Sequence, residues 1–350
     1  MIAINSRFLT QKITGTQRYA IEISKQISKL LEDKMFIAPR NIIHKNIACD
    51  LQVKIVGKLT SHLWEQIELP IYLKKQGNPL LINLVNTAPL FYRNQIVTIH
   101  DLAFLRYPKW FSKKFYYFYR FLIPKTAKSA RKIITVSEFS KNEIISMLNI
   151  SEKKVEVVYN AVSENFKYNP SIKKENYILA VSSLDPRKNF KNLMLAFKEL
   201  NLRNYRLVIV GSENKVFSNV KIKNLIKEIP NVEFTGYVSD DRLVKLYQKA
   251  KLFVYPSLYE GFGLPPLEAM ACGTPVVVSN VASLPEVCGD AAYYVNPYDV
   301  KNIARGIETV LKDEILQKEL IQRGLERVKL FSWERSAEKL AKIIQEVSNE

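Results

Sequence analysis

The sequence predicts an α/β protein made of two doubly wound domains, each with a mostly parallel sheet. Short apolar runs of strand length alternate with longer helical or polar stretches along the chain. Such alternation is typical of strand–helix–strand units, in which helices cover both faces of a parallel sheet. The chain has 350 residues, which exceeds one ordinary core and fits two domains of about 150 residues each.

The apolar runs of the first half predict seven strands. They lie at residues 2–5, 35–37, 53–56, 80–84, 95–99, 132–137 and 155–159. Helical patterns lie at 19–31, 64–74 and 138–148, and Ser137 is the expected N-cap of the last of these. Residues 163–176 are polar and charged and show little apolar periodicity, so we place the linker there. The expected domains are 1–168 and 172–332, with the last helix, 333–350, packing back on the first domain.

The second half begins again with a strand and alternates in the same way. We expect strands at 177–183, 206–211, 232–238, 252–255, 275–279 and 291–295. A turn at 184–189 precedes a helix at 190–200, and further helices are expected at 240–250, at 264–272 and from 300 onward. Both halves are therefore predicted to be complete α/β units.

The positive charge of the chain is concentrated in its first half. The net charge is +18, of which residues 1–170 carry +14, from 26 Lys and Arg against 12 Asp and Glu. A basic domain of this kind favours an anionic partner, and nucleic acid or an anionic membrane leaflet would both satisfy it. No apolar run reaches the roughly 18 residues of a membrane span, and no signal peptide is evident, so we expect a soluble cytoplasmic protein. The three cysteines, Cys49, Cys272 and Cys288, lack metal-ligand spacing and are expected to be reduced and buried.

Residues 106–132 combine nine Lys and Arg with nine aromatic residues. Aromatic rings beside basic side chains are typical of a segment that lies on an anionic membrane surface. Single-stranded nucleic acid can use the same mixture through base stacking. The remaining interpretation is a core helix whose polar face is basic.

Residues 255–274 form the stretch that says most about function. Between the strands 252–255 and 275–279 lies a short helix, with Pro265 in its first turn and Gly273 just past its end. The glycines 261 and 263 expose backbone N–H groups in the loop before the helix, beside the positive end of its dipole. This arrangement favours an anion, and Glu260 and Glu268 flank it.

Three further positions fit an anionic ligand or a strand-end site. Arg187 and Lys188 lie at the start of the helix 190–200, where cations oppose the helix dipole unless an anion lies between them. Gly15 lies in a turn between a strand and a helix, which is the geometry for close approach of a phosphate. His100, beside Asp101, follows the strand 95–99, and ligands of doubly wound sheets bind at the carboxyl ends of strands.

Together these motifs resemble those of the retaining glycosyltransferases of family 4, and the resemblance extends along nearly the whole chain. The segments that carry it are 14–19, 99–101, 135–141, 158–161, 187–188, 260–268 and 331–334. The first half is also similar to bacterial enzymes that add hexoses to O-antigen, lipopolysaccharide or capsule precursors. The resemblance implies the GT-B fold, in which two Rossmann-like domains face each other across a cleft.

The resemblance implies a role for each candidate residue. Glu268 would hydrogen-bond the ribose of a nucleotide sugar. Glu260 would hold the transferred sugar and the distal phosphate, together with the backbone N–H groups of Gly261, Phe262, Gly263 and Leu264. Arg187 and Lys188 would neutralise the diphosphate leaving group, and Gly15 would let the N-terminal loop approach it. The backbone at Val238 would contact the base, and His100 would lie near the anomeric side of the sugar, so His100 and Glu260 are the candidate catalytic residues.

The implied activity is transfer of a hexose from a nucleoside-diphosphate sugar to a saccharide acceptor with retention of configuration. The acceptor would be lipid-linked and the enzyme peripheral to the inner face of the cytoplasmic membrane, with no cofactor. No two Asp residues are separated by one residue, so the metal clamp Asp-x-Asp is absent and we expect metal independence. An epimerase of the same fold is the nearest alternative. A basic nucleic-acid-binding protein is a third interpretation, although no nucleic-acid motif supports it.

Overall fold

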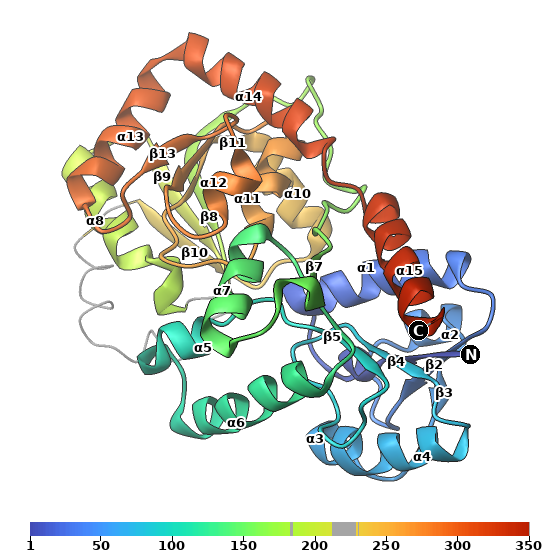
Figure 1. Cartoon of the computed structure of the whole chain (residues 1–350). Coiled ribbons are helices and arrows are strands. Elements are labelled where there is room, and N and C mark those ends of the chain that lie inside the picture. The colour runs from blue at the N-terminus through green and yellow to red at the C-terminus, as the bar shows by residue number, and fades with distance from the viewer. Residues whose placement is uncertain (183–184, 212–228, 230, 350) are drawn as a thin grey trace. The chain divides into compact units, whose positions relative to one another are not determined.

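The protein folds into two compact units. The computed structural model describes residues 1–182, 185–211, 229 and 231–349. The first unit comprises Met1–Asn160 and Ser332–Glu350, and the second comprises Ala161–Phe331. The boundary at residue 160 therefore precedes the segment 163–176 in which we expected the linker. Each unit contains one parallel sheet with helices packed on it, which confirms the predicted fold class (Figure 1).

The first unit contains a seven-stranded parallel sheet in the order β3-β2-β1-β4-β5-β6-β7. Its strands are β1 Ile2–Asn5, β2 Lys34–Ala38, β3 Lys54–Ile55, β4 Leu80–Asn83, β5 Gln95–Thr98, β6 Lys132–Thr135 and β7 Val155–Val157. Strand β1 pairs with β2 on one side and β4 on the other, so that Asn5 is opposite both Ile37 and Asn83. The direction in which the chain adds strands reverses between β1 and β4, which makes this the topological switch point of the sheet.

Helices connect and flank these strands. The α-helices of the first unit are α1 Gly15–Leu30, α2 Lys45–Asp50, α3 Ser61–Leu63, α4 Leu69–Lys75, α5 Ala103–Arg106, α6 Lys113–Ser129, α7 Glu138–Leu148 and α15 Trp333–Asn349. Short 3₁₀ turns lie at Arg7–Thr10, Pro108–Trp110 and Glu152–Lys154, and a π-helical turn at Trp64–Glu68 joins α3 to α4. The helix expected at 64–74 is thus present, but its first part is π-helical.

The C-terminal helix α15 belongs to the first unit. Its Trp333 packs edge-on against Tyr19 of α1, with ring centroids 6.0 Å apart. The Ser336 hydroxyl donates a 2.8 Å hydrogen bond to the carbonyl oxygen of Tyr159, which follows β7. The apolar stripe of α15, including Leu340 and Ile344, is buried. These contacts cover apolar surface that α1 alone would leave exposed to water.

The second unit contains a six-stranded parallel sheet in the order β10-β9-β8-β11-β12-β13. Its strands are β8 Glu175–Val181, β9 Arg206–Val210, β10 Val232–Gly236, β11 Ala250–Tyr255, β12 Val276–Ser279 and β13 Tyr293–Val295. Its helices are α8 Phe190–Leu200, α10 Asp240–Lys249, α11 Leu264–Ala271, α12 Leu284–Cys288, α13 Val300–Lys312 and α14 Glu314–Val328, with a 3₁₀ turn at Pro186–Lys188. The switch point of this sheet lies between β8 and β11.

Alternating strand residues build the core on one face of the second sheet. Ile178 and Ala180 of β8 are fully buried and belong to the apolar cluster formed with helices α8 and α13. Helix α13 packs so closely that a Cβ at Gly306 would lie 2.4 Å from Cγ1 of Val295. Glycine is therefore required at this contact, because a real Cβ atom does not approach another carbon to this distance.

Local signals set the ends of several helices as expected. Ser137 is the N-cap of α7, and its hydroxyl accepts a 3.0 Å hydrogen bond from the backbone N–H of Ser140. Helix α8 spans the predicted residues 190–200. The expectation that all three cysteines are buried is wrong for Cys49, which is exposed on α2 because that helix buries none of its residues. Within the described residues, none of the helices is long and apolar enough to cross a bilayer.

Candidate functional site

Two candidate residues meet at the switch point of the second sheet. Lys188 lies in the turn that follows β8, and Glu260 lies in the loop that follows β11. Because β8 and β11 are adjacent and parallel, their carboxyl ends open on the same edge of the sheet. Ligands of doubly wound sheets bind at this point. The sheet topology therefore brings together two residues that are 72 positions apart in the sequence.

Lys188 and Glu260 form a buried ion pair. Nζ of Lys188 lies 2.6 Å from Oε1 of Glu260, and each residue is only 8% exposed. The hydroxyl of Tyr255 donates to the same oxygen at 2.9 Å, and the hydroxyl of Ser257 also contacts it. Among the described residues, all hydrogen bonds to this carboxylate fall on Oε1, which leaves Oε2 for other donors.

The neighbouring charges keep Glu260 ionised. Burial by itself would raise the pKa of this carboxyl, but Lys188 and Arg187 outweigh burial and hold the pKa below its ordinary value. Burial and the charge of Glu260 raise the pKa of Tyr255 well above its ordinary value. Tyr255 thus keeps its proton and acts as a hydrogen-bond donor to the carboxylate.

The glycine loop before α11 has a conformation that only glycine adopts readily. Gly263 has a φ of +106°, and a Cβ there would lie 2.5 Å from Cδ2 of Leu284. The hydroxyl of Ser283 bonds the carbonyl oxygens of Glu260 and Phe262, at 3.0 and 2.7 Å. These contacts hold the loop, which includes Gly261, at the N-terminus of α11. Helix α11 begins at Leu264, and the dipole of a helix favours an anion at its N-terminus.

Glu268 lies on α11 and is also buried. The hydroxyl of Tyr247 on α10 donates a 2.9 Å hydrogen bond to its Oε2. Burial and the charge of Glu268 raise the pKa of Tyr247 well above its ordinary value, so the phenol stays protonated. Tyr247 therefore fixes the orientation of this carboxylate from a neighbouring helix.

The other cation of the turn, Arg187, is paired within the turn itself. Its Nε lies 3.2 Å from Oδ1 of Asp185, which also caps the turn by accepting from the backbone N–H of Arg187 at 3.0 Å. The carboxylates of Asp185 and Glu260 thus lie beside the two cations that we expected to need an anion. Ser183 and Leu184, which belong to the predicted strand and turn, lie outside the described residues.

His100 and Gly15 lie in the first unit. His100 follows β5 and is 6% exposed, and its Nε2 donates to the carbonyl oxygen of Leu84 at 3.1 Å. Burial lowers the pKa of this imidazole below its ordinary value, so the ring is neutral at pH 7. Gly15 is the first residue of α1, and a Cβ there would meet no atom within 4 Å. The fold of the described chain therefore does not itself require glycine at position 15.

Val238 follows β10, and its side chain is buried while the neighbouring Tyr237 is exposed.

Sequence reasoning did not identify the groups that hold the two glutamates and the loop between them, namely Tyr247, Tyr255, Ser257 and Ser283. Tyr255 and Ser257 lie five and three residues before Glu260, and this spacing is the one sequence signal that could have indicated them. The part of the chain that the structure describes holds no group of three or more His, Cys, Asp or Glu arranged for a metal ion.

Comparison with known proteins identifies the family. Residues 73–166 match the family model described as Glycosyltransferase Family 4, and residues 162–327 match the model described as Glycosyl transferases group 1. O-antigen chain mannosyltransferase B of Escherichia coli is 31% identical and aligns over 92% of this chain and 93% of its own length. O-antigen chain mannosyltransferase RfbU of Salmonella typhimurium is 35% identical over 70% of this chain and 68% of its own length.

A structural comparison agrees. The crystal structure of WaaG, a glycosyltransferase involved in lipopolysaccharide biosynthesis, matches with a TM-score of 0.76 at 16% identity and covers 98% of this chain and 99% of its own. The two parallel-sheet units and these matches define a GT-B glycosyltransferase. The chain belongs to glycosyltransferase family 4.

Proposed function

We propose that this glycosyltransferase moves a hexose from a nucleoside-diphosphate sugar to a lipid-linked saccharide in the synthesis of a bacterial surface polysaccharide. The observation that carries the proposal is the buried Lys188–Glu260 pair at the switch point of the second sheet. Two relatives are O-antigen mannosyltransferases, so mannose is the first sugar to test. Nothing in the described part of the structure favours epimerisation or nucleic-acid binding over glycosyl transfer.

The second unit is the proposed donor site. Cleavage of a sugar–diphosphate bond needs positive charge at the leaving phosphates while an oxocarbenium-like centre develops on the sugar. Lys188 supplies that charge from a position that Glu260 and Tyr255 already hold, so little reorganisation is needed. Oε2 of Glu260 accepts a hydrogen bond from a sugar hydroxyl, and the loop 261–264 holds the sugar and the distal phosphate. Glu268 accepts hydrogen bonds from the ribose hydroxyls.

Thermal shifts with UDP, GDP, dTDP and their sugars identify the donor, because a ligand that binds only the folded state raises the melting temperature. With that donor, Glu268→Ala and Lys188→Ala should each remove most transfer activity. Lys191→Ala and Glu199→Ala are matched controls, since both residues are exposed on α8. Near-normal turnover by both site variants would contradict the assignment of the site.

We further propose that transfer retains the anomeric configuration by front-face displacement and requires no metal ion. Neutral His100 is assigned to the anomeric side of the sugar, and Gly15 allows the leaving phosphate to approach α1. The configuration of the product follows from the anomeric coupling constants in NMR spectra, and an inverted product would contradict retention. Activity should persist in excess chelator, and a complete loss that Mn²⁺ restores would contradict metal independence.

The proposed membrane surface is built on α6. Four of its aromatic side chains, Phe115, Tyr117, Phe118 and Phe121, are exposed, with Tyr117 at 64%. A core helix would bury these rings, so their exposure argues against the core-helix interpretation of the basic aromatic segment. Exposed rings beside basic side chains suit the headgroup region of an anionic bilayer.

A second apolar stripe in the same unit extends this surface. Leu63, Ile67 and Ile71 follow one another at helical spacing along α3, the π-turn and α4, and all three are exposed, with Leu63 at 62%. The ring of His62 on α3 lies 4.8 Å from that of Phe118 on α6, so the two stripes belong to neighbouring helices. The sequence predicted only the first of these stripes.

We therefore propose that the enzyme is cytoplasmic and binds the inner face of the membrane through this surface. Neutralising Lys109, Lys113, Lys114, Lys125 and Lys128 should weaken co-sedimentation with phosphatidylglycerol vesicles much more than with phosphatidylcholine vesicles. The matched control neutralises five exposed lysines of the second unit, Lys191, Lys245, Lys249, Lys301 and Lys318. Equal losses of co-sedimentation in the two variants would show that binding depends only on net charge and would contradict the proposed surface.

A further inference from the structure

A buried polar network lies at the switch point of the first sheet. Asn5 ends β1 and Asn83 ends the adjacent strand β4, and the side-chain amide of Asn5 donates to Oδ1 of Asn83 at 2.9 Å. Both side chains are fully buried. This is the same topological position that Lys188 and Glu260 occupy in the second sheet, and it is the position where doubly wound sheets bind ligands.

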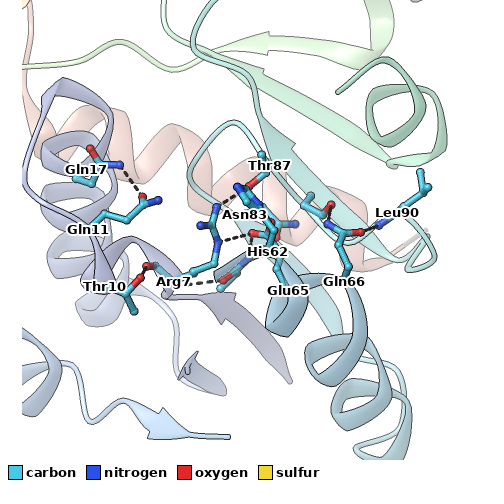
Figure 2. A network of polar contacts seen from close by, with 12 residues as sticks. Arg7, Thr10, Gln11, Gln17, His62, Glu65, Gln66, Asn83, Thr87 and Leu90 are labelled. Carbon is cyan, nitrogen blue, oxygen red and sulfur yellow. Dashed lines mark hydrogen bonds and ion pairs between the residues drawn. The ribbon is translucent and has the colours of Figure 1, made fainter. Parts of the chain in front are cut away.

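A cation and a carboxylate complete the network. Nε of Arg7 donates to Oε1 of Glu65 at 2.9 Å, and its Nη2 donates to the hydroxyl of Thr87 at 2.6 Å. Asn5 also donates to Oε1 of Glu65, at 3.1 Å. Figure 2 shows Arg7, Glu65, Asn83 and Thr87 converging from separate segments of the chain. Within the described residues, Nη1 of Arg7 makes no hydrogen bond, so the guanidinium keeps donor capacity beyond the network.

His62 is the most exposed member of the network, and the side chain of Arg7 is 3% exposed. Nδ1 of His62 lies 3.3 Å from Oε2 of Glu65, and the His62 side chain is 31% exposed whereas that of Glu65 is 0%. The ionised carboxylate can only accept, so Nδ1 carries a proton and donates to it, and Nε2 is left for a partner outside the network. The rings of Phe118 and Tyr119 lie 4.8 and 6.5 Å from the imidazole and form a wall beside it.

The helix that carries His62 and Glu65 is distorted where it meets the network. Trp64–Glu68 is π-helical, and such turns occur frequently at functional sites. Gln66 in this turn accepts from the backbone N–H of Leu90 at 2.9 Å and donates to the carbonyl oxygen of Ala88 at 2.9 Å, which ties the turn to the loop after β4. A buried charge pair is weak evidence for stability, because apolar residues of similar volume often serve a core as well. Its position at a strand-end switch point therefore favours a binding role.

We propose that His62 and Arg7 bind the saccharide of the acceptor. Nε2 of His62 forms a hydrogen bond with one sugar hydroxyl, and Nη1 of Arg7 donates to the oxygen of another. Glu65 is the positioning residue, since its two carboxylate oxygens hold the imidazole and the guanidinium. The aromatic rings beside His62 lie on α6, the helix of the proposed membrane surface, which suits a saccharide carried by a lipid. The inference rests on the proposed transferase function and names the acceptor site for it.

The test separates acceptor binding from donor binding. Octyl α-mannoside, octyl β-galactoside and octyl β-N-acetylglucosaminide serve as acceptor probes, with the donor identified by thermal shift. For the probe that wild-type enzyme uses best, His62→Ala should raise the acceptor KM about tenfold or more, and leave the donor KM and donor hydrolysis without acceptor within about twofold. His44→Ala is the matched control, because His44 is a partly exposed histidine of the same unit that bonds the carbonyl oxygen of Gln11 outside the network.

Arg7→Lys is the second variant. It keeps the positive charge beside Glu65 but loses the planar fork, so the acceptor KM should rise while the melting temperature stays near that of wild type. An acceptor KM within twofold of wild type in His62→Ala, or an equal rise in the donor KM, would overturn the inference and leave the proposed function standing. A wild-type enzyme that binds donor but transfers sugar to none of the three octyl glycosides would overturn both together.

Discussion

Removing the charge of Lys188 tests how strongly the buried pair of the second unit is coupled. Lys188→Met keeps most of the side-chain volume but leaves the carboxylate of Glu260, which is 8% exposed, with the neutral donors Tyr255 and Ser257 in direct contact. Breaking a buried pair on one side costs about 3–5 kcal/mol of unfolding free energy, because an uncompensated charge remains inside. We expect a loss near the lower end, about 3 kcal/mol, since two hydroxyls still donate to Oε1 and the charge of Arg187 remains nearby.

The assay is urea unfolding of wild type, Lys188→Met, Glu260→Gln and the double variant. All three tryptophans lie in the first unit, so their fluorescence reports on that unit while circular dichroism reports on both. Only the unfolding midpoint of the second unit should shift to lower urea concentration. The double variant removes both charges, and its loss should fall short of the sum of the single losses by at least about 2 kcal/mol. Additive losses within about 0.5 kcal/mol would refute the reasoning.

Acidification gives an independent check of the same pair. The pKa of Glu260 is lowered in the folded state, so the stability that its ionised form contributes is complete above the ordinary carboxyl pKa of 4.5. That contribution is lost as the pH falls below 4.5 and through the lowered folded value. The difference in unfolding free energy between wild type and Lys188→Met should therefore shrink on acidification, and a constant difference from pH 7 to pH 3 would contradict this.

Three further changes test separate parts of the structure. Gly263→Ala should destabilise the second unit by about 2 kcal/mol or more in urea unfolding, because its left-handed backbone and close packing both oppose a Cβ. Tyr247→Phe should cost about 2 kcal/mol in the same assay and weaken donor binding in calorimetry, because the buried Glu268 loses a charge-assisted hydrogen bond. The pairing of Glu65 with Arg7 lowers the pKa of Glu65 to about 2, against the opposing effect of burial. Wild type should therefore lose about 3 kcal/mol relative to Glu65→Gln between pH 5 and pH 2, as followed by tryptophan fluorescence.

Matched controls accompany these three variants. Gly77→Ala carries backbone strain alone, because Gly77 has a φ of +84° but a Cβ there meets nothing within 4 Å, so it should cost less than Gly263→Ala. Tyr237→Phe changes an exposed phenol and should alter neither stability nor donor binding. Glu32→Gln changes an exposed carboxylate of the first unit, so the acid-induced loss followed by tryptophan fluorescence should equal that of wild type. Equal effects in variant and control would contradict the corresponding prediction.

Local patterns in the sequence were sufficient for the kind and order of most elements. The helix predicted at 190–200 spans those residues, and the N-cap predicted at Ser137 is confirmed. These succeed because hydrophobic period and capping act within a few residues of the chain. The π-turn at Trp64–Glu68 has no such local signature, since a helical period of apolar residues does not distinguish it from an α-helix.

Sequence motifs also indicated Lys188, Glu260 and Glu268 as candidate binding residues, because a glycine loop, a capped helix and flanking carboxylates lie in one short stretch. Their partners were not indicated. Only the structure shows that Tyr247 reaches Glu268 and that Lys188 takes Glu260 as its counter-ion. A burial pattern predicts that a side chain points inward, but not which inward-pointing group it will meet.

By itself, then, the sequence determined the α/β class, the two-domain length and the glycine-lined loop with its two carboxylates. The tertiary structure decided how charges separated by tens of residues combine. Lys188 and Glu260 are 72 positions apart and Arg7 and Glu65 are 58 apart, yet each pair meets at a switch point. The physical reason is that parallel strands bring their carboxyl ends to one edge of a sheet, and the order of the strands, which no local pattern encodes, selects the residues that meet there.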